Sequence, residues 1–181
     1  MGSFYVNCAI RGASHNQIVG YLKYSRRTAY VSPTFNGTTF VYEQESDSQD
    51  GTAIERLAED PSRAFKTHVL AALNHDDDIL IYWLFHNGNL LDDYNSAPGV
   101  LEGEKRPPDG GDPEILCRSF EVPDVVPYVR NILSKTSYTC ELERHFALGD
   151  ALRMPREYLD WGFNRIEHNL PLDRPNFIRI G

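Results

Sequence analysis

The chain has 181 residues, a formal net charge of −8 at pH 7 and 41% hydrophobic residues. This length suffices for one domain with a sizeable core, and the composition is that of a globular protein rather than a disordered chain. The excess of acid disfavours a nucleic-acid binder, because phosphate contacts need clustered Lys and Arg. No apolar run approaches the roughly 18 residues of a membrane span. The first residues also lack the basic and apolar regions of a signal peptide.

The cysteines bear on the cellular compartment. Cys8, Cys117 and Cys140 are odd in number and far apart in the chain. They match neither a disulfide framework nor a zinc-binding spacing. We therefore expect a cytoplasmic protein with reduced thiols, and we predict no cofactor.

Up to Leu73, the pattern predicts strand, helix, strand, strand, helix, strand. The expected strands span residues 4–10, 28–32, 38–42 and 69–73, and the expected helices span residues 14–24 and a segment around 54–58. Ser14 and Gln17 have the spacing of a capping box. We expect Asp47 or Ser48 to cap the second helix and Pro61 to end it or lie just beyond it. This element order is that of the ferredoxin-like, split βαβ arrangement.

The densest apolar runs, Val69 to Leu73 and Ile79 to Phe85, lie in the middle of the chain. The second run has no polar face, which indicates a central strand covered on both sides. Asn87-Gly88 after it tolerates the positive φ of a two-residue hairpin turn. A weaker strand around residues 90–94 completes an antiparallel meander. We expect this meander to extend the sheet to about five to six strands.

The second half of the chain has a different composition. Residues 97–112 are rich in Pro and Gly and predict a long loop. Residues 113–168 have apolar residues at helical spacing, and residues 169–181 predict an extended tail whose Phe177, Ile178 and Ile180 dock on the body. We therefore expect a single α+β domain, in which residues 1–96 form an antiparallel sheet followed by this C-terminal helical part.

An acidic group provides one candidate site. It comprises His75, Asp76, Asp77 and Asp78, with Asp92 and Asp93 nearby in sequence. A hard divalent cation needs several converging carboxylate oxygens, but the spacing of an EF-hand loop is missing. A meander also places the 74–78 turn and the 87–89 turn at opposite ends of their shared strand, which separates the two acidic groups. A solvated turn is therefore the simpler interpretation of residues 76–78.

A second candidate lies at the far end of the meander, where His86, Asn87, Tyr94 and Asn95 precede the Pro/Gly loop. If the central stretch carries function, we expect it between His86 and Ser96, where polar side chains lead into a long loop.

Other chemistries have weaker signals. Cys140 and His145 are five residues apart, a spacing that does not place them on one face of a helix. No nucleophile elbow or phosphate-binding loop is present. Residues 147–167 resemble a helix-turn-helix only superficially, because their acidic side chains offset Arg156 and Arg165. We expect this pair of helices to close over the sheet.

Two functional hypotheses follow from the acidic loops at residues 43–50, 76–78, 92–93 and 102–104. The leading one is an interaction module that steers a basic partner protein, as toxin-neutralising proteins do. The alternative is a metal-dependent enzyme that uses His75 and the neighbouring carboxylates.

Overall fold

A computed structural model describes residues 2–104, 106–136, 138–168 and 177–181. Within them, an open antiparallel sheet has the strand order β7-β6-β5-β4-β1-β3-β2-β8. The predicted α+β class is therefore confirmed. The strands are β1 (Phe4–Arg11), β2 (Ala29–Val31), β3 (Thr38–Glu43), β4 (His68–His75), β5 (Ile79–His86), β6 (Asn89–Asn95), β7 (Asp109–Gly110) and β8 (Ile178–Ile180). The α-helices are α1 (His15–Tyr24), α2 (Gly51–Phe65), α3 (Pro113–Ser119), α4 (Val126–Ser134), α5 (Glu141–Ala151) and α6 (Phe163–His168).

Strands β4, β5 and β6 form the antiparallel meander expected from the sequence. His75 pairs with Ile79 beside one turn, and His68 pairs with His86 beside the other. Asn87 and Gly88 have φ values of 51° and 78°, as a two-residue hairpin turn requires. The two turns therefore lie at opposite ends of the sheet.

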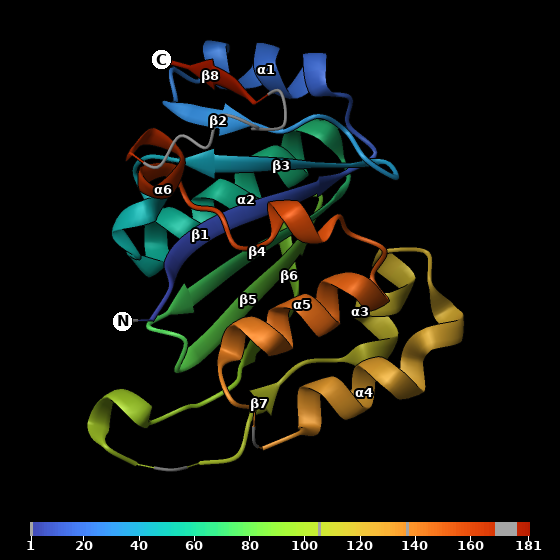
Figure 1. The fold of residues 1–181 in the computed structure, drawn as a ribbon. Helices are drawn as coiled ribbons and strands as arrows, with labels where there is room; N and C mark the ends of the chain where they lie inside the picture. Colours follow the sequence, from blue (N-terminus) through green and yellow to red (C-terminus); the bar gives the residue numbers. More distant parts are fainter. Residues whose placement is uncertain (1, 105, 137, 169–176) are drawn as a thin grey trace.

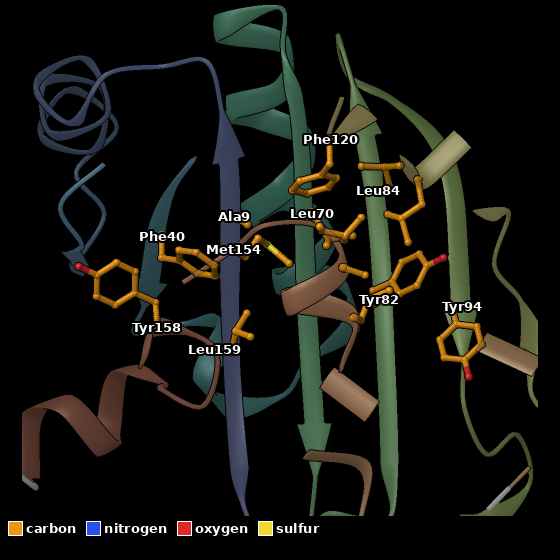
Figure 2. Close-up of a cluster of buried hydrophobic side chains, with 14 of the residues drawn as sticks. Ala9, Phe40, Leu70, Tyr82, Leu84, Tyr94, Phe120, Met154, Tyr158 and Leu159 are labelled. Carbon is orange, nitrogen blue, oxygen red and sulfur yellow. The ribbon is translucent and has the colours of Figure 1, made fainter. Parts of the chain in front are cut away.

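Helices cover both faces of the sheet (Figure 1). Alternate side chains of a strand point to opposite faces, so Val6, Cys8 and Ile10 of β1 pack with α1 and α2 on one side. The other side faces the C-terminal helices. Its core combines side chains from the strands, such as Leu70 and Tyr82, with side chains from the C-terminal half, such as Phe120, Met154 and Leu159 (Figure 2).

The prediction that Pro61 ends the second helix or lies just beyond it was wrong, because Pro61 lies inside α2. Proline has no N–H group and cannot donate to the carbonyl four residues earlier. That carbonyl belongs to Leu57, and it accepts a hydrogen bond from the Cys8 thiol, with an Sγ–O distance of 3.6 Å. Strand β1 therefore supplies the donor that the helix lacks.

A backbone amide at position 61 should reduce the contribution of the Cys8 thiol to stability. We expect Cys8→Ala to lower the free energy of unfolding by about 1–2 kcal/mol, since it leaves a buried carbonyl unpaired. In a Pro61→Ala background the same change should cost about 1 kcal/mol less, because a backbone amide at position 61 is then available to the Leu57 carbonyl. Urea denaturation of the four proteins of this double-mutant cycle measures the difference. Additive effects would contradict the coupling.

The expected cap of the second helix also needs correction. Asp50, rather than Asp47 or Ser48, caps α2, and its carboxylate accepts the Ala53 amide at 2.9 Å. Asp47 instead caps α6, where its carboxylate accepts the amides of Phe163 and Asn164 at 3.1 and 2.8 Å. Asp47 therefore stabilises the start of a helix that lies 116 residues further along the chain.

The C-terminal half also differs in detail from the prediction. The loop expected at residues 97–112 contains a short 3₁₀ turn, Val100–Glu102, and strand β7, which pairs with Tyr94 and Asn95 of β6. Residues 169–176 of the predicted tail lie outside the described residues. Beyond them, β8 pairs with β2 and extends the sheet. Strands β7 and β8 raise the strand number above the expected five to six.

Candidate functional site

The acidic turn between β4 and β5 is a structural clamp as well as a surface feature. The Asp76 and Asp77 carboxylates accept the backbone amides of Gly2 and Ser3 at 2.9 and 3.0 Å. The Asp77 carbonyl accepts the amide of Glu141, the first residue of α5, at 2.8 Å. Asp76 and Asp78 are exposed, but the turn also makes structural contacts that the interpretation as a solvated turn did not include. The turn joins the N-terminal strand to the start of α5.

A buried polar cluster lies beneath the clamp. Asn74 is fully buried, and its Oδ1 accepts the Asp77 amide at 3.1 Å. Asn74 Nδ2 and Asp77 Oδ1 are both buried without a hydrogen-bond partner among the described residues. Nearby, the hydroxyl of Tyr5 lies 2.8 Å from Nδ1 of His145. Burial lowers the pKa of His145 to about 4 and raises the pKa of Tyr5 well above its usual range, so this pair is neutral at pH 7.

A pocket of about 270 Å³ opens beside the clamp. Its walls are the β4–β5 turn, the segment after β6 and the segment before α5. The described residues that line it are Asp77, Asp78, Ser96, Ala97, Val100, Glu104, Arg106, Thr136, Tyr138, Thr139, Cys140 and Glu141. These include four carboxylates against one arginine, and that arginine is paired with Glu104. We call this feature the acidic pocket.

Arg144 of α5 supports the wall of the acidic pocket from inside. Only 1% of its surface is exposed. Its guanidinium donates to the Glu141 carboxylate at 2.6 Å and to the carbonyls of Ile132 and Lys135 at 2.6 and 2.8 Å. It thereby joins α5 to the C-terminal end of α4, whose last carbonyls lack helical partners. Sequence reasoning missed this residue, because nothing in the pattern distinguishes it from a solvent-facing arginine.

His75 has its own structural contacts. Its Nδ1 lies 2.6 Å from Oε1 of Gln49, and its ring meets the edge of Phe4 at a centroid distance of 4.9 Å. In the part of the chain that the structure describes, no three His, Cys, Asp or Glu side chains are grouped so that they could hold a metal ion. The metal-dependent hypothesis gains no support from this geometry.

His86 and Asn87 lie at the opposite end of the sheet from the acidic pocket. The ring of His86 stacks on that of His68 with a centroid distance of 4.4 Å. Burial, with the neighbouring His86 as a smaller cause, lowers the pKa of His68. The structure therefore does not bring His86 and Asn87 together with Tyr94 and Asn95, as one site at the far end of the meander would require.

The two aspartates of β6 have different surroundings. Asp92 accepts the Tyr82 hydroxyl at 2.7 Å and the Asp112 amide at 3.0 Å, so it holds the start of α3 against the sheet. Burial raises the pKa of Asp92. Asp93 points to the other face of the sheet, where its side chain is exposed.

Tyr94 and Asn95 both have structural partners. The Tyr94 ring is buried, and its hydroxyl donates to the Leu133 carbonyl at 2.9 Å. Asn95 accepts the Ala97 amide at 2.9 Å and thereby shapes the segment that enters the acidic pocket. Of the residues in the two predicted candidate sites, only Asp77 and Asp78 line the pocket.

Comparison of the chain with protein-family models, curated proteins and solved structures found no match. In the described residues, no helix is both long and apolar enough to cross a membrane. A function for this chain is therefore inferred from its own sequence and geometry.

Proposed function

We propose that the protein is an interaction module whose acidic pocket binds a basic segment of a partner protein. The observation that carries this proposal is the position of Asp77 and Asp78 in the pocket wall, where neither has an ion pair with a described cation. Glu104 and Glu141 add further negative charge, although each is paired with an arginine.

The chemistry of the pocket favours a lysine or arginine side chain. The pocket is lined by the carboxylates of Asp77 and Asp78 and by the hydroxyl groups of Ser96, Thr136 and Thr139. Carboxylates and hydroxyls accept hydrogen bonds from ammonium or guanidinium groups, and such charge-assisted bonds are stronger than neutral ones. The net charge of −8 would also accelerate the approach of a basic partner.

Binding of a fluorescent oligolysine peptide tests this proposal. We expect affinity to fall at least tenfold between about 50 mM and about 500 mM salt, because salt screens exposed charges. Asp78→Asn should weaken binding about fivefold at the lower salt concentration, as expected for one exposed ion pair of up to about 1 kcal/mol. Fluorescence anisotropy measures both effects.

Asp124→Asn provides the matched control. It removes the same charge from an exposed site on the short turn Pro123–Val125, whose residues do not line the pocket. The control should bind like the parent protein. Equal losses in the two variants would show that only net charge matters and would contradict a role for the pocket.

We also propose four properties that accompany this function. The order β4-β1-β3-β2 supports a ferredoxin-like arrangement of the first four strands. Continuity of one sheet from β7 to β8 supports a single domain. Burial of the free thiols of Cys8 and Cys117, which raises the pKa of both, supports a cytoplasmic location, and the acidic charge supports a partner other than nucleic acid.

A further inference from the structure

One face of the sheet carries apolar side chains that its helices cover only in part. Ile81 and Trp83 of β5 point to the α2 side and are partly buried there. Leu90 of β6 pairs with Phe85, whose side chain belongs to the same core, so Leu90 points to this face as well. Leu90 is 50% exposed. The apolar surface therefore continues beyond α2 toward the sheet edge.

Carboxylates border this apolar strip on both sides. Asp93 pairs with Trp83, so it shares the same face, and it is exposed. On α2, Ser62 accepts the Gly88 amide at 2.9 Å, which directs that flank of the helix toward the β5–β6 turn. Glu55 precedes Ser62 by seven residues, or two helical turns, and therefore lies on the same flank.

Glu59 lies between Glu55 and Ser62 on this flank of α2 and pairs with Arg63. Glu55 and Asp93 have no ion pair with a described cation. We name the strip and its border, comprising Ile81, Trp83, Leu90, Asp93 and Glu55, the α2–β6 surface.

We propose that the α2–β6 surface docks an amphipathic, basic segment of a partner protein. Its apolar side chains would cover Ile81, Trp83 and Leu90, and its lysines or arginines would face Glu55 and Asp93. The negative charge of Glu55 and Asp93 favours a basic occupant. A second copy of this acidic chain or an anionic membrane would bring negative charge against these carboxylates. This inference rests on the proposed function, in that both require a basic partner, but it uses a different surface.

Trp83 makes docking directly measurable. The chain has two tryptophans, and Trp161→Phe leaves Trp83 as the sole reporter. The probe is a synthetic Leu/Lys peptide of about 18 residues, about five helical turns, with leucine along one helical face. A peptide of the same composition in scrambled order serves as the charge-matched comparison. We expect the amphipathic peptide to shift Trp83 emission to shorter wavelength and to bind at least tenfold tighter than the scrambled one.

Leu90→Lys should weaken binding of the amphipathic peptide about tenfold, because it removes apolar contact area and adds a repelling charge. The exposure of Leu90 makes the change tolerable to the fold, and circular dichroism verifies this. Tyr128→Lys is the matched control, since Tyr128 is 53% exposed on α4 in the opposite helical layer. It should leave the affinity unchanged.

The outcomes separate the two proposals. Equal binding of both peptides, with sensitivity to Asp78→Asn alone, would overturn docking on the α2–β6 surface and leave the acidic pocket in place. Sensitivity to Leu90→Lys without sensitivity to Asp78→Asn would support the surface and contradict the pocket. No binding of either peptide would contradict both. Self-association in sedimentation experiments that Leu90→Lys abolishes would assign the surface to a second copy and overturn the proposed occupant.

Discussion

Arg144→Met should lower the free energy of unfolding by about 3–5 kcal/mol, the usual cost of removing one partner of a buried ion pair. The substitution leaves the buried Glu141 carboxylate and the carbonyls of Ile132 and Lys135 without their donor. Arg144→Lys should restore only part of the loss, because an ammonium group cannot reproduce the planar fork of the guanidinium. Urea denaturation measures both variants.

Arg130→Met is the control for this prediction. Arg130 pairs with Glu114, but its side chain is 59% exposed. Exposed pairs contribute about 0–1 kcal/mol, so the same substitution should have little effect there. If Arg144→Met lowers the free energy of unfolding as little as Arg130→Met does, the hydrogen bonds of the Arg144 guanidinium do not stabilise the fold. Arg144 would then act through its aliphatic part, which methionine retains.

Acidification should destabilise the fold by about 3 kcal/mol through His145 alone. Burial lowers the pKa of His145 to about 4 from its ordinary 6.5. The unfolded chain therefore takes up this proton at higher pH than the folded protein does. Stability from the neutral imidazole is complete above pH 6.5, declines as the pH falls through that value, and is fully lost below about pH 4.

A pH series of urea denaturations on the parent and on His145→Gln tests this effect. Glutamine can still bond to the Tyr5 hydroxyl but has no proton to gain, so the decline between pH 6.5 and 4 should be about 3 kcal/mol smaller. His168→Gln is the control, because that side chain is exposed near the end of α6. Parallel profiles for the parent and His145→Gln would refute the effect.

The strands were predictable where a local pattern determines them. Long apolar runs predicted β1, β3, β4 and β5, and the turn at Asn87-Gly88 predicted the meander. Strands β7 and β8 have only two and three residues, which is too short for an alternating pattern. Pro61 shows a second limit. Inside α2, Pro61 leaves the Leu57 carbonyl without a helical donor. The thiol that bonds this carbonyl lies 49 positions away in the chain, and no local rule can predict such a contact.

The candidate site depended on tertiary contacts still more strongly. The cluster of acids at residues 76–78 was visible in the sequence, and so was its separation from Asp92 and Asp93. The other walls of the acidic pocket come from the segments around Glu104 and Cys140, and no periodicity links these to the turn. Arg144 was also invisible, because its burial follows from the carbonyls that α4 presents to it.

The clamp at the β4–β5 turn makes ligand binding inseparable from folding. Gly2 and Asp76 are 74 positions apart in the chain, and Glu141 is joined to the same turn from the C-terminal half. The walls of the acidic pocket therefore come together only when the β4–β5 turn has packed against the C-terminal half. A ligand that binds it stabilises the whole native state, by about 2.7 kcal/mol at one hundred times its dissociation constant. An increase in melting temperature would therefore report binding without any label.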